Sequence, residues 1–293
     1  MMSTRPDISE ISSHFKVVDL FDRYFSVSHA RGGIALLENL LSHFSRFPYE
    51  NISKIIKYQH HFQGTEKLRL PGEIMEDHAR HRLGGTCFSL TYFLQIILCR
   101  HGFICYPVMA DMRWGRNVHC ALVVDLDEKK YLVDPGYLLH RPMEMHPGKP
   151  RLYKTECSGV ELVFEVNSDR IELYTFDRHQ KKWRYRFQDR PVSADTFLDH
   201  WLSSFHWNSM HGLCLTKLEK DRMVYIHKTF MRETTFDRKV NTNIKNRVHE
   251  SIHGIFGIDP GLVEQAMAAV KINMEREREM GLWVPKSHRG KAE

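Results

Sequence analysis

The chain has 293 residues, of which 42% are hydrophobic and 27% are charged, and its 42 Lys and Arg against 36 Asp and Glu give a formal net charge of +6. This mixture is typical of a globular protein and excludes a disordered or collagen-like chain. The longest apolar run, at residues 90–99, is half of the roughly 20 residues that a membrane span needs, so no membrane partner is expected.

Residues 1–15 contain no apolar secretory segment, which favours a cytoplasmic protein. The six cysteines are too sparse for a disulfide framework, and we interpret them as reduced thiols. The small net charge fits an anionic small substrate as well as a weak attraction to nucleic acid.

The N-terminal part of the chain is predicted to be helical. Residues 35–47 carry Leu and Phe at three- and four-residue spacing, which predicts a helix that ends before Pro48. The segment PYENISKII follows at 48–56. Residues 87–99 (CFSLTYFLQIILC) are apolar nearly all round, which predicts a buried helix that ends near Gly102.

From residue 104 onwards the period changes to that of strands, rich in Val, Ile, Tyr and Trp. The expected strands are 106–114, 119–126, 131–134, 161–166, 171–176, 183–187 and 223–230. Helices are expected at 193–205 and at 261–280, the second capped by Asp259 and Pro260, with a loose end at 285–293. Helices followed by antiparallel strands predict the α+β class.

Cys87 follows two glycines and begins the predicted buried helix. Unpaired N–H groups and the positive end of the helix dipole favour a thiolate there, and they can hold an oxyanion that forms beside it. Gly84 and Gly85 are expected to let a substrate carbonyl approach the backbone. A small buried hydrophobic residue is the other interpretation of this cysteine, and both stay open.

His119 begins one predicted strand and Asp134 ends the next. Each alone is more typical of a structural role, as a buried histidine and as part of an Asp-Pro-Gly turn. Antiparallel pairing, however, places both at the same end of one hairpin, where their side chains can meet. With Cys87 they form the pattern of nucleophile, base and orienting carboxylate.

The chain resembles the arylamine N-acetyltransferases. The resemblance rests on short motifs in the family's order, across most of residues 20–260: PYEN at 48–51, LGGTCFS at 83–89, VHCALVV at 118–124, DPGYL at 134–138 and IFGI at 255–258. The chain departs from the family pattern at four positions: Leu83, Ser89, Thr91 and Val118. The family's Ser/Thr-Ser-Pro stretch is not found at 209–212.

The resemblance implies a papain-like cysteine core in three domains: a helical domain at 1–86 that ends at the catalytic cysteine, a β-barrel at 87–190 that carries His119 and Asp134, and an α/β lid at 191–293. It implies ping-pong transfer of an acyl group, acetyl in the family, from acetyl-CoA through Cys87 to an arylamine or hydrazine nitrogen, with no permanently bound cofactor. By family position, Tyr49, Val118 and Tyr137 would line the acyl and acceptor pocket.

The departures keep other hypotheses open. They are an amide synthase that uses another acyl carrier, a thiol hydrolase or transglutaminase-like enzyme on the same three residues, and a catalytically inactive binding module. His78 and His81 with Cys87 match no metal motif, so no metal is expected. Residues 181–186 (KKWRYR) suit a nucleic-acid surface, but a strand with one basic face is the favoured interpretation, and no nucleic acid is expected. The sequence makes no prediction about oligomeric state.

Overall fold

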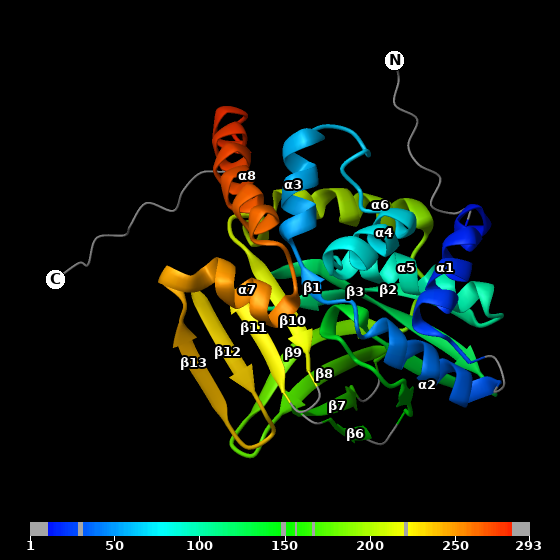
Figure 1. Cartoon of the computed structure of the whole chain (residues 1–293). Helices are drawn as coiled ribbons and strands as arrows, with labels where there is room; N and C mark the ends of the chain where they lie inside the picture. Colours follow the sequence, from blue (N-terminus) through cyan, green and yellow to red (C-terminus); the bar gives the residue numbers. More distant parts are fainter. Residues whose placement is uncertain are drawn as a thin grey trace.

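The computed structural model describes residues 11–28, 32–147, 151–155, 157–165, 168–219 and 222–282. Within these ranges, helices gather on one side of the molecule and antiparallel strands form two sheets (Figure 1). This arrangement confirms the predicted α+β class. The expected loose end at 285–293 lies outside the described residues.

The N-terminal region is helical, as predicted. Its helices are η1 (Ile11–His14), α1 (Phe15–Phe25), α2 (Gly33–Phe44), α3 (Ile52–His60), α4 (Pro71–His81) and α5 (Cys87–Arg100). The helix predicted at 35–47 ends three residues earlier than expected, where the chain bends into the strand that follows Pro48.

Helix α5 is the centre of the larger hydrophobic core. Its residues from Cys87 to Leu94 are all buried, which confirms the prediction from an apolar pattern that runs round the whole helix. The Phe93 ring lies 5.5–6.2 Å from the rings of Phe21, Phe44 and Phe47, so one side chain joins α1, α2 and α5. The opposite side of α5 packs on two central strands of the larger sheet.

The larger sheet has eight antiparallel strands in the order β5-β4-β3-β2-β9-β8-β7-β6. Their bounds are β2 (Ile104–Met112), β3 (Gly115–Leu126), β4 (Lys129–Val133), β5 (Met143–Met145), β6 (Arg151–Lys154), β7 (Gly159–Phe164), β8 (Arg170–Phe176) and β9 (Lys181–Gln188). The hydroxyl of Tyr153 on one edge strand donates to the Glu144 carbonyl on the other (3.2 Å), so the sheet curls into a nearly closed barrel.

The smaller sheet has the order β1-β10-β11-β12-β13. Its strands are β1 (Tyr49–Glu50), β10 (Cys214–Leu218), β11 (Met223–His227), β12 (Phe230–Thr234) and β13 (Lys239–Asn243). The single strand predicted at 223–230 is wrong, because Lys228 adopts a left-handed φ of 55° and the chain reverses there. Strand β1 pairs with β10, so the segment that precedes α3 belongs to a sheet made mostly by the C-terminal third.

The remaining helices are η2 (Pro135–Tyr137), α6 (Ala194–Ser203), η3 (Ser204–His206), η4 (Asn208–Met210), η5 (Lys245–Arg247), α7 (Val248–Phe256) and α8 (Pro260–Glu279). Helix α8 begins as predicted, with the Asp259 carboxylate accepting from the Gly261 N–H (2.8 Å). It lies beside α3, where the Asn273 amide donates to the Ile55 carbonyl (3.1 Å) (Figure 1). Among the described helices, none has an apolar stretch long enough to cross a bilayer.

Replacement of Phe93 by Ala is expected to destabilise the protein by about 3–5 kcal/mol, because it opens a cavity where α1, α2 and α5 meet. Urea unfolding followed by circular dichroism measures this change. Leu20→Ala is the matched control on the exposed face of α1, with an expected effect of about 0.5 kcal/mol or less. Equal losses in the two variants would contradict this view of the core.

Candidate active site

Three separate elements bring Cys87, His119 and Asp134 together. Cys87 is the first residue of α5, His119 lies on β3, and Asp134 caps η2 directly after β4. His119 Nε2 lies 2.8 Å from Asp134 Oδ2. A Cβ built on Gly136 would lie 2.8 Å from His119 Cε1 and 3.0 Å from Cys87 Cβ, so only glycine fits where these side chains converge.

The buried Asp134 carboxylate is fully satisfied by hydrogen bonds. Besides His119, the Tyr185 hydroxyl donates to Oδ2 (2.7 Å), and the Tyr137 N–H donates to Oδ1 (3.1 Å). The rings of Tyr137 and Tyr185 also lie 5.3 and 4.9 Å from the imidazole. Because Nε2 faces Asp134, Nδ1 is the ring nitrogen left for the thiol.

The electrostatics favour a thiolate and an imidazolium at neutral pH. A hydrogen bond with the Cys120 thiol, together with the hydrogen bond and charge of His119, holds the pKa of Cys87 well below its usual value although burial opposes the shift. Burial lowers the pKa of His119, but the charges and hydrogen bonds of Asp134 and Cys87 outweigh it and raise that pKa to about 10. Both shifts favour the charged forms of the two side chains, a thiolate beside an imidazolium.

The first turn of α5 is closed by Ser89. Its Oγ accepts from the Thr86 N–H (3.1 Å) and donates to the Thr86 carbonyl (3.0 Å). This bonding fixes the helix N-terminus on which Cys87 sits, where the dipole supports a negative charge. The serine that departs from the family pattern thus has a local structural role.

Gly84 and Gly85 are needed for a reason that differs from the one predicted. A Cβ on Gly84 would lie 2.0 Å from the Pro48 carbonyl oxygen, and one on Gly85 would lie 2.4 Å from Ser89 Oγ. The chain itself occupies these spaces, and the expectation that the glycines open the backbone to a substrate carbonyl stays a prediction. Their missing side chains let the 48–51 segment pack against the loop that precedes Cys87.

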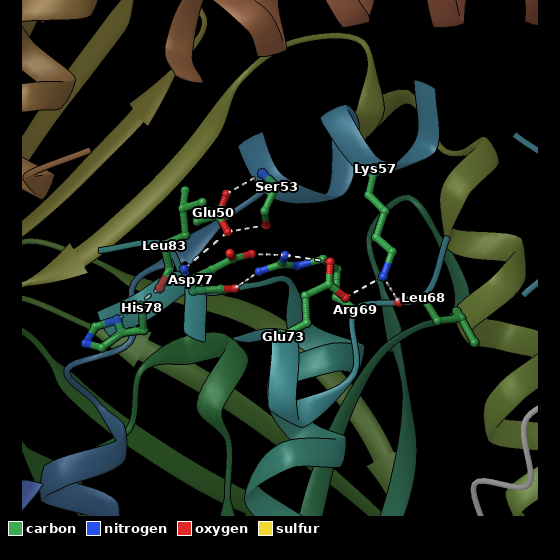
Figure 2. A network of polar contacts seen from close by, with 10 residues as sticks. Glu50, Ser53, Lys57, Leu68, Arg69, Glu73, Asp77, His78 and Leu83 are labelled. Carbon is green, nitrogen blue, oxygen red and sulfur yellow. Dashed lines mark hydrogen bonds and ion pairs between the residues drawn. The ribbon is translucent and has the colours of Figure 1, made fainter. Parts of the chain in front are cut away.

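A network of buried polar side chains holds that loop (Figure 2). The Gly84 N–H donates to Glu50 (3.2 Å), and the Gly84 carbonyl accepts from Arg69 (3.3 Å). Glu50 also accepts from the Ser53 N–H (2.9 Å). Both backbone groups of Gly84 are thus fixed by side chains from outside the loop, three residues before Cys87 begins α5.

The guanidinium that contacts the loop before Cys87 comes from Arg69 and not from the motif position. Leu83, at the motif position, is buried and apolar, while the adjacent Arg82 is exposed and donates to the Tyr24 hydroxyl. Arg69 is only 4% exposed and pairs with Glu73 (3.0 Å) and with Asp77 on α4 (Figure 2). A guanidinium from a different stretch of sequence therefore supports the loop before the cysteine.

The three residues predicted to line a pocket lie on elements that adjoin the three central residues. Tyr49 forms a bridge with Gly85, and burial followed by the charges of Cys214 and Cys87 raises the pKa of its phenol. Tyr137 places its ring edge-on to His119. Val118 is half-buried and precedes His119 on β3. Their role in binding a substrate stays a prediction.

Other sequence features resolve into structural roles. His78 bonds through Nδ1 to the Leu83 carbonyl (2.9 Å), and within the described ranges no group of three His, Cys, Asp or Glu side chains could hold a metal ion. Residues 181–188 form strand β9, as favoured, with Tyr185 turned inward to Asp134. Sequence reasoning missed Tyr185, although the alternation of residues 183–187 places it on one face with two other aromatic residues. It also missed Arg69 and Cys120.

Comparisons with known proteins agree with this arrangement. A family model described as N-acetyltransferase matches residues 34–262. Solved arylamine N-acetyltransferases from three organisms have a similar fold, each with a TM-score of 0.71. The enzyme of Mycobacterium abscessus is 16% identical, and the match covers 89% of this chain and 97% of that one. The enzyme of Salmonella typhimurium is 15% identical, with coverages of 86% and 98%, and that of Nocardia farcinica is 19% identical, with coverages of 91% and 95%. A comparison with curated proteins finds no match. At these identities the structural likeness shows the fold.

Replacement of Arg69 by Met is expected to destabilise the protein by roughly 2–4 kcal/mol and to slow alkylation of Cys87, because the Gly84 carbonyl loses its donor. Urea unfolding and the rate of iodoacetamide labelling measure the two effects. Arg82→Met is the matched control, since Arg82 precedes the same loop but is exposed. A larger effect in the Arg82 variant would show that Arg82, and not Arg69, supports the loop.

Proposed function

Because this chain belongs to the N-acetyltransferase family, we propose that it transfers an acyl group from a CoA thioester to an amine nitrogen through an acyl-enzyme on Cys87. Acetyl is the simplest group, with acetyl-CoA as donor and no permanently bound cofactor. One observation carries this proposal: the Cys87 sulfur shares a buried site with an imidazole whose other nitrogen is bonded to Asp134. Cys87, His119 and Asp134 are then nucleophile, base and orienting carboxylate.

In the first half of the reaction, the Cys87 thiolate attacks the thioester carbonyl and forms a new S–C bond. The tetrahedral oxyanion is held by unpaired N–H groups at the start of α5. The C–S bond to coenzyme A then breaks, and the leaving thiolate takes the proton of the His119 imidazolium. The acyl group stays on Cys87 and His119 is left neutral.

In the second half, the amine attacks the acyl-enzyme carbonyl, and neutral His119 takes the proton that the nitrogen loses. The C–S bond to Cys87 breaks, which releases the amide and restores the thiolate and the imidazolium. Asp134 keeps the imidazole in one orientation throughout and stabilises its charged form.

The acceptor that we propose is an arylamine or an aryl hydrazine. Tyr49, whose strand bridges to the loop before Cys87, and Tyr137, whose ring lies against His119, would offer aromatic surfaces that suit a flat ring, and Val118 would add an apolar contact. We assign residues 1–86, 87–190 and 191–293 to a helical, a barrel and a lid domain around a papain-like core. The lid would exclude water, so that an amine and not water resolves the acyl-enzyme.

Replacement of Cys87 by Ser is expected to abolish acyl transfer, a loss of roughly 10³-fold or more, because a serine hydroxyl stays protonated where the thiol is ionised. Without an acceptor, the wild-type protein should release one CoA per active site in a rapid burst, and intact-mass spectrometry should find the acyl group on Cys87. Cys99→Ser, at the far end of the same helix, should keep the full burst. A stoichiometric burst from Cys87→Ser would end this assignment.

The pH dependence of alkylation tests the thiolate–imidazolium pair. The lowered pKa of Cys87 keeps the thiolate populated at neutral pH, and labelling by iodoacetamide should fall only in acid, with an inflection well below the roughly 8.5 of a free thiol. His119→Asn should move the inflection upward. Burial raises the pKa of Cys214 to about 11, so this internal control should react slowly at neutral pH. A wild-type inflection near 8.5 would contradict the pair.

A further inference from the structure

A buried lysine lies in the electrostatic environment of Cys87. Lys54, near the start of α3, is only 4% exposed. Its Nζ donates to the Ser204 carbonyl (3.1 Å) and hydroxyl (2.6 Å) and lies 4.3 Å from the centre of the Phe205 ring. All of these partners are neutral. Across the described ranges, no carboxylate lies within ion-pair distance of this ammonium group.

A second buried lysine reinforces this positive site. The Lys67 ammonium lies 5.3 Å from the centre of the same Phe205 ring, 5.6 Å from that of Tyr58, and donates to the Phe62 carbonyl (3.3 Å). It is 6% exposed. Two ammonium groups therefore share one aromatic ring without a carboxylate partner in the described structure.

The buried carboxylate on the α8 side of this cluster is already engaged. Glu277 accepts from His211 (2.7 Å), and its charge and hydrogen bond add to burial in raising the pKa of Tyr58. Its charge also acts on His206, as do those of both lysines. In this cluster one carboxylate faces two ammonium groups, and it touches neither of them in the described structure.

A buried cation with no carboxylate in direct contact favours an anion that can reach it. Burial lowers the pKa of Lys54 to about 7, and the charge of Lys67 acts in the same direction, against the charges of Cys87 and Cys120. A carboxylate beside Nζ would offset the desolvation that burial imposes and would form a charge-assisted hydrogen bond. Lys54 follows β1, which pairs with the loop before Cys87, so such an anion would lie close to the reacting sulfur.

We propose that Lys54 is a specificity-determining residue that binds a carboxylate carried by the substrate, on the acyl group or on the amine. This inference rests on the proposed function and adds the chemical class of its substrate. The bound carboxylate would lie between the Lys54 ammonium and the Cys87 site, with Lys67 adding long-range attraction. A neutral substrate of equal size would leave the cation unpaired.

Three pairs of substrates, matched in shape and divided into a donor arm and an acceptor arm, distinguish the two sources of the carboxylate. In the donor arm, malonyl-CoA is compared with propionyl-CoA and succinyl-CoA with butyryl-CoA, and the rate of Cys87 acylation is followed by intact-mass spectrometry. In the acceptor arm, 4-aminobenzoate is compared with 4-methylaniline after acetylation of Cys87. Each pair exchanges a carboxylate for a methyl group and changes little else.

Three variants separate charge recognition from a structural role. Lys54→Gln removes the charge but keeps an N–H donor for Ser204, and Lys54→Arg keeps the charge. Lys271→Gln, on the exposed face of α8, is the control for a lost surface charge. We expect the wild type to prefer the carboxylate member of at least one pair by roughly 10- to 100-fold in kcat/KM. Lys54→Gln should erase this preference, and Lys54→Arg and Lys271→Gln should retain it.

The outcomes also distinguish this inference from the proposed function. Acylation of Cys87 without preference in either arm overturns the role of Lys54 and leaves acyl transfer standing. Equal loss for both members of every pair in Lys54→Gln also overturns it, since the lysine would then only join α3 to the end of α6. Failure of every thioester to acylate Cys87 overturns both proposals.

Discussion

The hydrogen bond between His119 and Asp134 is the interaction on which the site depends. A carboxylate with no exposed surface is stable only if nearby donors replace the water that it loses. Here the donors come from three elements: the imidazole from β3, the Tyr185 hydroxyl from β9 and the Tyr137 N–H from η2. The curled barrel is what brings β9 to this carboxylate, because β9 pairs with β2 and not with β4. The barrel therefore fixes the position and the charge of the imidazole in one step.

The cysteine is fixed by a second and independent set of contacts. Glu50 and Arg69 hold the two backbone groups of Gly84, and Ser89 closes the first turn of α5. Glu50 itself belongs to β1, which is paired with β10 of the smaller sheet. Cys87 is thus positioned by the helical side and the smaller sheet, while His119 is positioned by the barrel. Their meeting at Gly136 depends on the packing of α5 against β2 and β3, so the core and the site share the same contacts.

Local pattern predicted much of this structure. The all-round apolar sequence of α5 and the strands β2, β3, β4, β7, β8 and β9 were predictable because their periods are set by which face is buried. The short strands β5 and β6 were not predicted. The meeting of His119 with Asp134 was predictable because both lie at one end of a single hairpin. Tyr185 and Arg69 were not, because they reach Asp134 and Gly84 from elements 51 and 15 residues away, and only the fold sets those distances. The turn at Lys228 was not predictable because it contains neither glycine nor asparagine. The space beside the two glycines before Cys87 was not predictable either, because the same two glycines would be needed whether a substrate or the chain itself fills it.

The charge of Lys54 links selectivity to reactivity. In the free site, the sulfur is stabilised as a thiolate by the Cys120 thiol, by His119 and, more weakly, by Lys54. A carboxylate bound to Lys54 would cancel the contribution of the lysine, which would raise the thiol pKa and with it the intrinsic nucleophilicity of the thiolate. The His119 partner, with its pKa of about 10, would still keep the sulfur ionised at neutral pH. A substrate that fills the cation site would therefore meet a thiolate that is more reactive than that of the empty enzyme, and a substrate without a carboxylate would not.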